Sequence, residues 1–412
     1  MLAVPFWDRH RPSPRSVSGP HLDCSRPGAG VGEAMACSWD DLAALSLARQ
    51  FPKVAGRCAA AVAQTVARIG PIQAQTARSP FLGLAARIPG VRLDDICAAY
   101  DELLIVRGSN IRGTVHTCTP QDHALLEAVT RIGQRALWAR MLKLKATTLE
   151  EVWEGIEEYA RDDWRTPQEL HVHLRRWLQR HDRTALAAID TTAGRYLGFG
   201  HGGLLRKPVK GGWQTQGAPV YRTASALLGD RSAVLADTDG ALDAIVRRHL
   251  SAYGPASRHD IAWWSGLGLR VVDAALARLA GQTTGQQGPD GRIYHDLLDV
   301  PAAADPPDLR LLPEFDALLC GYDPKARDRF VSPKHHRRLW SQDNGALLAP
   351  MLYEGRLSGY WRLAGAGSRR SCEVAWFAGT RRPRKSDFDG PVAALEAAYG
   401  VTVTGVSITR DP

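Results

Sequence analysis

The stretch Ser257-Arg258-His259-Asp260-Ile261-Ala262-Trp263-Trp264 decides the predicted fold. Ser257 and Asp260 have the spacing of a capping box, in which each side chain bonds the other residue's backbone N–H at a helix start. A Gly- and Pro-rich segment at residues 285–294 follows and is typical of a β-hairpin turn. Helices followed by a short β-ribbon make a winged helix, which is a variant of the helix-turn-helix.

The same kind of helix start recurs upstream in the chain, at Ser38-Trp39-Asp40-Asp41, Thr119-Pro120-Gln121-Asp122 and Thr166-Pro167-Gln168-Glu169. Two of these starts add a proline at the first helical position, which suits the fixed φ angle of that residue. A second candidate hairpin at residues 204–213 follows the Thr166 helix, with its tip at residues 208–212. We therefore predict about three winged-helix modules in tandem, with three unrelated αβ segments as the alternative.

The pattern changes near residue 304. Short, partly alternating apolar segments with glycine turns occur at residues 311–313, 346–348, 357–362 and 401–406, with a helix expected at 391–399. The predicted fold class is α+β, with tandem winged-helix modules and a C-terminal β-barrel-like domain. The predicted boundaries are a disordered tail at 1–37, winged helices at 38–148, 149–234 and 235–303, and the barrel at 304–412.

Composition limits the class of protein. The chain has 412 residues, of which 44% are hydrophobic and 23% charged, as in ordinary globular proteins. It lacks an apolar run long enough to span a bilayer and an apolar signal-peptide core, so we expect a cytoplasmic protein. The seven cysteines never form a C-x-x-C pair, and His171 and His173 stand apart from other ligand types. We expect no metal and no cofactor.

The charge of the chain indicates its partner. The formal net charge is +9 and the pI is about 9.3, which suits a polyanion. Nucleic acid is the polyanion that such a charge favours most. A generally basic protein without such a partner remains an alternative on charge alone.

The triplet Gln73-Ala74-Gln75 is the candidate catalytic motif. In an extended segment, side chains two residues apart point the same way. Each amide offers a carbonyl acceptor and an NH2 donor, so the pair is able to hold a water beside a sugar without carrying charge. Taken alone, a Q-x-Q triplet is common in loops and identifies nothing.

Further landmarks occur in order along the chain: Leu47-Ala48-Arg49-Gln50, the Q-x-Q triplet, Arg112-Gly113-Thr114-Val115-His116, Tyr253-Gly254-Pro255-Ala256 and Leu312-Pro313-Glu314-Phe315-Asp316. Together they resemble the bacterial winged-helix DNA glycosylases related to the azinomycin-resistance glycosylase. The resemblance implies a C-shaped clamp around double-stranded DNA, with the Q-x-Q motif at the active site. It also implies excision of N7-alkylated purines, including cross-linked ones, and a specialised branch linked to self-resistance against a genotoxic antibiotic.

Two amides are suited to this chemistry. An N7-alkylated purine is already cationic, so the base departs neutral and needs no general acid. The enzyme then needs a positioned water and oriented dipoles near the developing sugar cation. We therefore predict that Gln73 and Gln75 are catalytic and that neutral lesions such as uracil are poor substrates.

Other residues near the landmarks have candidate roles. Arg112, Thr114 and His116 alternate and are predicted to share one strand face, either as active-site support or as a structural polar cluster. Glu314 and Asp316 are expected to bond backbone or arginine partners within the barrel rather than to act in catalysis. The DNA-binding candidates are Arg49, the wing residues Arg206, Lys207 and Lys210, and the basic turns with Arg369, Arg370, Arg382, Arg384 and Lys385.

Two other classes of function remain open on the sequence. A non-catalytic winged-helix regulator shares the charge and the modules, but usually dimerises on a palindromic site. A scaffold that sequesters a genotoxin is the second alternative. Modules that differ from one another within one chain favour a monomer over a symmetric dimer. No lysine stands near the glutamine pair to form a Schiff base, so a monofunctional enzyme that leaves an abasic site is expected.

Overall fold

The computed structural model describes residues 37–340 and 347–411. The tail predicted for residues 1–37 falls outside the described residues except for its last one. Cys37 is buried, and its backbone N–H donates to the Gln287 carbonyl at 3.1 Å. The folded chain therefore includes one residue that the sequence assigns to a disordered tail.

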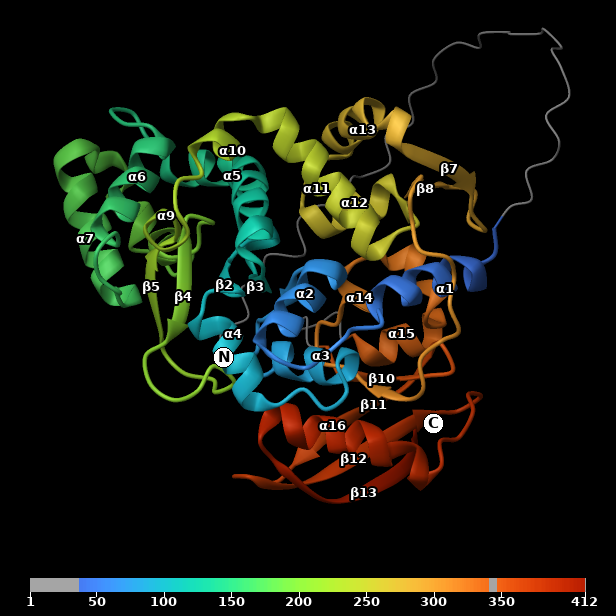
Figure 1. The fold of residues 1–412 in the computed structure, drawn as a ribbon. Helices are drawn as coiled ribbons and strands as arrows, with labels where there is room; N and C mark the ends of the chain where they lie inside the picture. Colours follow the sequence, from blue (N-terminus) through green and yellow to red (C-terminus); the bar gives the residue numbers. More distant parts are fainter. Residues whose placement is uncertain (1–36, 341–346, 412) are drawn as a thin grey trace, which may run out of the picture.

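One five-stranded sheet joins the first two predicted modules (Figure 1). Its order is β1-β3-β2-β4-β5, and β2 meets β4 through Gly108 and Leu205. The strands are β1 (Ile72–Gln73), β2 (Val106–Ser109), β3 (Val115–Cys118), β4 (Leu204–Pro208) and β5 (Pro219–Thr223). The predicted modules 38–148 and 149–234 are thus continuous through backbone pairing.

Helices make up most of the rest of this part of the chain. They are α1 (Trp39–Gln50), α2 (Ala59–Ile69), α3 (Ser79–Arg87), α4 (Leu93–Asp101), α5 (Pro120–Leu142), α6 (Leu149–Tyr159), α7 (Pro167–His181), α8 (Leu186–Ile189), α9 (Ala224–Leu228) and α10 (Ser232–Ala236). Short 3-10 turns lie at Ile111–Gly113, Arg183–Ala185 and Gly194–Gly198. Within the described ranges, no helix combines the length and the apolar character that crossing a membrane requires.

The predicted helix starts are confirmed. Ser38, Thr166 and Ser257 each form a capping box, with Asp41, Glu169 and Asp260 respectively. Thr119 caps α5 by accepting from the Asp122 N–H. Each pairing satisfies a backbone N–H that the first helical turn leaves without a partner.

The third unit contains the stretch from Ser257 to Trp264. Its elements are α11 (Thr238–Tyr253), β6 (Ala256–Ser257), α12 (Arg258–Ser265), α13 (Leu269–Arg278), the 3-10 turn Ala280–Gln282, β7 (Thr283–Gln287) and β8 (Ile293–Leu297). The hairpin predicted there is present as β7–β8. A second predicted hairpin is present as β4–β5, but its loop runs over residues 209–218 and is longer than expected. The winged-helix assignment of the units stays a prediction.

A second five-stranded sheet forms the C-terminal part, in the order β13-β12-β11-β10-β9, and curls like half of a barrel. Its elements are β9 (Arg310–Leu311), α14 (Ala317–Cys320), the 3-10 turn Pro324–Arg329, α15 (Pro333–Leu339), β10 (Ala349–Tyr353), β11 (Arg356–Ala364), β12 (Arg369–Phe377), the 3-10 turn Lys385–Phe388, α16 (Asp389–Tyr399) and β13 (Thr402–Asp411). Figure 1 shows α16 between this sheet and α3. The predicted segment 346–348 precedes β10, and its first residue lies outside the described residues.

The predicted basic turn at Arg369 and Arg370 is wrong in its secondary structure. Both residues begin β12, where they pair with Thr402 and Val403 of the parallel strand β13. The turn is confined to residues 365–368. After β12, α16 carries the chain back along the sheet, so that β13 lies parallel to β12.

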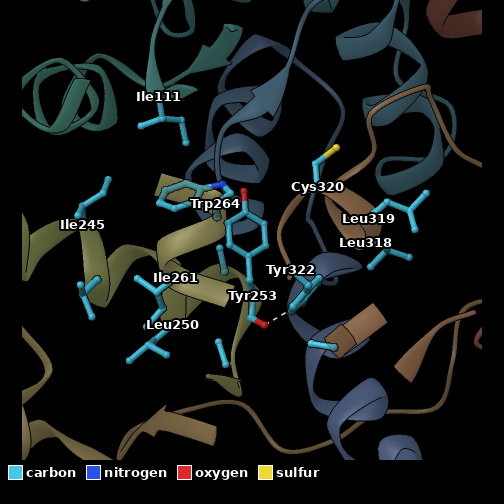
Figure 2. Packing of buried hydrophobic residues seen from close by; sticks show 14 of the residues in the cluster. Ile111, Ile245, Leu250, Tyr253, Ile261, Trp264, Leu318, Leu319, Cys320 and Tyr322 are labelled. Carbon is cyan, nitrogen blue, oxygen red and sulfur yellow. Dashed lines mark hydrogen bonds between the residues drawn. The ribbon is translucent and has the colours of Figure 1, made fainter. Parts of the chain in front are cut away.

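The main hydrophobic core joins the first unit, the third unit and the start of the C-terminal part. Figure 2 shows Tyr253 between Trp264 and Tyr322, with the Tyr322 hydroxyl donating to the Tyr253 carbonyl at 2.8 Å. The Tyr253 ring centroid lies 5.6 Å from that of Trp264. This packing fixes α11 and α12 behind the segment that carries the Q-x-Q motif.

Candidate active site

The Q-x-Q motif begins at the end of strand β1 and continues into the bend that follows. Gln73 is the last residue of β1 and pairs with His116 of β3, and the Ala74 N–H still donates to the Val115 carbonyl at 2.7 Å. Gln75 lies in the bend that follows. Gln73 is buried, with 8% of its surface exposed, whereas Gln75 is exposed. The extended geometry predicted to align both amides therefore holds only at Gln73.

Protein donors hold both amide carbonyls. Gln73 Oε1 accepts from Arg112 Nη2 at 3.3 Å, and Gln75 Oε1 accepts from the Val115 N–H at 3.4 Å. Both distances are at the long end for such bonds. A carbonyl oxygen has two lone pairs, so each retains the capacity to accept from a water.

Arg112 bridges the motif to the third unit. It lies in the 3-10 turn Ile111–Gly113 with a φ of 58°, and its Nη1 donates to the Trp264 carbonyl of α12. Thr114 Oγ1 donates to the Ile111 carbonyl at 3.2 Å and so stabilises the same turn. The prediction that Arg112, Thr114 and His116 share one strand face is wrong, because β3 begins only at Val115.

His116 is a neutral acceptor at this site. Its Nδ1 lies 3.1 Å from the Thr114 carbonyl, which only accepts, so Nδ1 carries the proton and Nε2 is left with a lone pair. Burial, and then the nearby Arg112 charge, lower the pKa of His116 to about 3. The imidazole is therefore uncharged at neutral pH.

A small cavity lies against these three side chains. Gln73, Arg112 and His116 line it together with Tyr253 and Trp264. The space open to the centre of a water molecule is about 20 Å³. One water needs about 10–15 Å³ on this measure, so the cavity has room for a water and none for a purine.

Gly70 fixes the chain where it enters the motif. Its φ is 90°, a conformation that favours glycine, and a Cβ there would lie 2.4 Å from the Tyr253 hydroxyl. That hydroxyl donates to the Pro71 carbonyl at 3.3 Å. The close approach of Tyr253 thus requires a residue without a side chain.

Two sequence landmarks form polar contacts at the cavity, whose lining includes Gln50, Arg87 and Asp316. Arg87 donates to both carboxylate oxygens of Asp316, at 3.0 and 3.1 Å, and also to the carbonyl and side-chain oxygens of Gln50. Glu314 pairs with Arg78, in the turn after the motif. The prediction that Glu314 and Asp316 bond arginine partners is confirmed, but the arginines lie in the first unit and not within the C-terminal domain as expected.

Arg49 has a structural position, contrary to its predicted DNA contact. It is 4% exposed, and its Nη2 lies 2.7 Å from an Asp296 carboxylate oxygen. Its Nη1 donates to the Leu250 carbonyl at 3.1 Å. Because its guanidinium is enclosed and paired, Arg49 ties α1 to the third unit and is withdrawn from the DNA-binding set.

The remaining basic residues divide by exposure. Arg206 is half-buried, and its Cζ atom lies 5.7 Å from the centroid of the Tyr221 ring. Lys207 is also half-buried, and its Nζ atom lies 4.4 Å from the centroid of the Trp164 ring. Arg370 is half-buried, and its Nε donates to the Gly367 carbonyl. The exposed members of the predicted set are Lys210, Arg369, Arg382, Arg384 and Lys385.

The sequence interpretation missed one segment that reaches the motif. Gln216, in the loop between β4 and β5, accepts from the Ala77 N–H at 2.9 Å. Trp213 of the same loop stacks on Tyr100 of α4. A tryptophan in a Gly- and Gln-rich hairpin loop was the available signal, because such a ring usually packs against something.

With this geometry in hand, comparison with known proteins is informative. Residues 66–398 match the family model described as DNA glycosylase AlkZ-like. The chain belongs to the AlkZ-like DNA glycosylase family. It is therefore a DNA glycosylase, and the non-catalytic regulator is not favoured.

Two comparisons cover nearly the whole chain. A curated relative from Streptomyces sahachiroi, named as an interstrand DNA cross-link repair glycosylase, is 24% identical over 392 residues, or 90% of this chain and 98% of that protein. The solved structure of the Streptomyces sahachiroi DNA glycosylase AlkZ is similar, with a TM-score of 0.74 at 19% identity. The match covers 91% of this chain and 100% of that chain. This AlkZ-like chain thus has the mixed α+β fold of AlkZ.

Proposed function

We propose that this AlkZ-like chain is a monofunctional glycosylase that hydrolyses the N-glycosidic bond of N7-alkylated, cationic purines in double-stranded DNA. Its substrates include bulky natural-product adducts and interstrand cross-links, and the name of the Streptomyces relative supports the second of these. Its role is repair that protects a cell from a genotoxic antibiotic. The observation that carries the proposal is Gln73 beside a water-sized cavity, with neutral His116 and Arg112 around it.

The neutral state of His116 favours a leaving base that is already cationic. The net charge of the cavity lining does not favour one, because Arg87 and Arg112 outweigh Asp316 there. Asp316 contributes a carboxylate to the cavity lining, and Arg87 holds it in two hydrogen bonds. His116 is neutral and its Nε2 accepts, so it has no proton to give a departing base. A base that already carries a positive charge departs neutral without receiving a proton, whereas a neutral base needs an acid.

We assign the roles of the side chains as follows. Arg112 orients the Gln73 carbonyl, whose second lone pair accepts from the attacking water. His116 Nε2 is the second acceptor for that water. Gln75 is exposed and meets the sugar of the damaged nucleotide from outside the cavity. Preorganised groups of this kind act without reorganising as charge develops.

The lesion base stays outside the cavity in this proposal. A space of about 20 Å³ excludes a purine, and a bulky or cross-linked base would be harder still to enclose. The exposed cations Lys210, Arg369, Arg382, Arg384 and Lys385 contact DNA phosphates. We infer a monomer bound to one damaged site.

Substrate selectivity tests the proposal. Matched duplexes carry a single N7-methylguanine or a single uracil, and alkaline cleavage reports the abasic sites that the purified protein makes. We expect single-turnover excision of N7-methylguanine and excision of uracil slower by at least about 100-fold, the size of effect that one missing catalytic group produces. Equal rates on both lesions would refute the dependence on a cationic base.

A further inference from the structure

We propose that the β4–β5 loop (residues 209–218) positions the Q-x-Q segment for the reaction, with Trp213 and Gln216 as its positioning residues. The proposal rests on the function proposed above. It extends the active site to a segment that follows Gln75 by more than a hundred residues. In Figure 1 this loop extends from the ends of β4 and β5 toward α4.

The first contact is at the C-terminal side of the motif. The Ala77 N–H donates to Gln216 at 2.9 Å, and only the side-chain oxygen of a glutamine is able to accept that bond. Ala77 lies in the turn two residues after Gln75, between the bend and α3. The bond therefore restrains the backbone that carries Gln75.

The second contact anchors the loop itself. The Trp213 ring stacks on Tyr100 with centroids 4.3 Å apart and an interplanar angle of 11°. The indole N–H donates to Asp101 Oδ1 at 2.8 Å, and Arg107 Nη1 donates to the Trp213 carbonyl at 3.1 Å. These contacts fix the loop in one place on the first unit, and with it Gln216.

A third set of contacts leads from this anchor to Gln73. The Tyr100 hydroxyl lies 2.6 Å from Thr117 Oγ1, and Arg107 Nη2 donates to the same hydroxyl at 2.9 Å. Thr117 pairs with Ile72, the residue before Gln73. The loop therefore supports the motif on both sides, through Ala77 after it and through β3 and β1 before it.

The loop also carries Lys210, which is exposed and belongs to the proposed phosphate contacts. A single loop thus touches the catalytic segment and, in our account, the DNA. Gln216 acts through the backbone at Ala77, so it is a positioning residue. Removing it is expected to slow the chemical step while leaving DNA affinity nearly unchanged.

The test compares Gln216→Ala, Gln216→Glu and Thr215→Ala in the full chain. Gln216 and Thr215 are both exposed on the loop, so neither truncation disturbs the core. Glutamate keeps an oxygen acceptor for Ala77, whereas alanine has none. Three quantities are measured: the single-turnover excision rate on N7-methylguanine DNA, the Kd for that DNA, and amide hydrogen exchange at Ala77.

We expect Gln216→Ala to excise about fivefold more slowly, the factor that one hydrogen bond of typical strength supplies. Its Kd should stay within about twofold, and Ala77 should exchange faster by a factor similar to that of the rate loss. Gln216→Glu should restore the exchange protection and the single-turnover rate. Thr215→Ala should match the wild type in every measurement.

A wild-type rate in Gln216→Ala would overturn the proposal, whatever happens to the exchange. A rate loss that Gln216→Glu does not restore, with unchanged exchange at Ala77, would overturn it as well. Gln73→Ala is assayed alongside to keep the two proposals apart. Full activity in Gln73→Ala refutes the role assigned to Gln73, and absence of excision by the wild type refutes the proposed function; in either case exchange at Ala77 still decides whether the loop holds the segment.

Discussion

Arg112 holds Gln73 from a backbone conformation that few residues other than glycine adopt, with a φ of 58°. Its two terminal nitrogens serve two different partners, Gln73 Oε1 and the Trp264 carbonyl. Burial lowers the pKa of this guanidinium from its ordinary value. A left-handed backbone and a buried guanidinium both lower the stability of the fold. In our account they are retained because Arg112 orients the Gln73 amide toward a water.

Arg112→Lys tests this link. A lysine ammonium retains the charge but lacks the rigid fork that reaches two acceptors at once. We expect the single-turnover excision rate to fall about tenfold with little change in the Kd for DNA, because the group that orients Gln73 is removed. Arg78→Lys, at a pair outside the cavity, is the matched control and should stay near the wild-type rate. A slower Arg78→Lys, or an unchanged Arg112→Lys, would contradict the assigned role.

Glu314→Gln tests whether this carboxylate is only structural. Glu314 pairs with partly exposed Arg78, so the substitution should lower the free energy of unfolding by about 1 kcal/mol or less. The excision rate should remain within about threefold of wild type, because Glu314 does not line the cavity. Loss of excision in a folded Glu314→Gln protein would give this carboxylate a catalytic part.

At the scale of single residues, the sequence indicated which kinds of side chain suit the chemistry better than it indicated where those side chains lie in the fold. The glutamine pair was proposed because neutral amides suit the chemistry, and His116 because it belongs to a landmark and alternates with Arg112 and Thr114; the roles of all of them stay predictions. The alternation of Arg112, Thr114 and His116 was misleading, since a left-handed turn interrupts the strand. The ion pair between Arg49 and Asp296 joins residues 247 positions apart, which local patterns do not reveal.

Elements were predicted best where their signals are local. Capping boxes predict helix starts because both partners lie within four residues of each other. Turns rich in Gly and Pro predicted both hairpins. Strand β12 was missed because its first residues, Arg369 and Arg370, look like a basic loop. Its neighbour β13 pairs in parallel after an intervening helix, and such a pairing leaves no local signal.

The exposed basic loops make a prediction at the element scale. Reversing Lys210, Arg382, Arg384 and Lys385 to Glu should weaken DNA binding. It should also lower the slope of log K against log salt by about 0.9 for each phosphate that the protein no longer neutralises. Lys334→Glu, an exposed reversal on α15 outside the predicted DNA surface, is the control and should leave the slope close to that of the wild type. An unchanged salt slope in the four-fold variant would remove these loops from the DNA surface.

On the scale of the whole molecule, the first two units are built around one sheet. The pairing of Gly108 with Leu205 joins β2 to β4, so the boundary predicted at 148/149 crosses a continuous ladder. The Trp213 stack on Tyr100 adds a second connection between these units. Sequence patterns predicted the modules one at a time, because neither long-range pairing produces a periodic signal.

Buried histidines make the stability of the whole fold depend on pH. Burial lowers the pKa values of His116, His123 and His249 to about 3. Between about 3 and 6.5 the folded state therefore binds fewer protons than the unfolded state, and stability falls as pH falls through that window. The slope is about 1.4 kcal/mol per pH unit for each such histidine. Burial raises the pKa of Glu157 to about 7, which acts in the opposite direction, but one carboxyl does not offset three imidazoles.

Urea unfolding at pH 7, 6 and 5 measures this dependence. The midpoint should fall steadily toward pH 5, and His249→Gln should show a shallower fall because one fewer group titrates. The His249→Gln protein is less stable at pH 7, so the slope and not the midpoint is compared. A stability that is flat or rises between pH 7 and 5 would show that these histidines are accessible to protons in the fold.

The central claim is that two amides carry the reaction, and one measurement addresses it directly. Single-turnover excision is followed on a duplex with one N7-methylguanine for the wild type, Gln73→Ala and Gln75→Ala. Gln64→Ala, on the exposed side of α2, serves as the control. We predict excision by the wild type and by Gln64→Ala, and a loss of about 100-fold or more in each motif variant, as for a removed preorganised group. Wild-type rates in both motif variants would contradict the account.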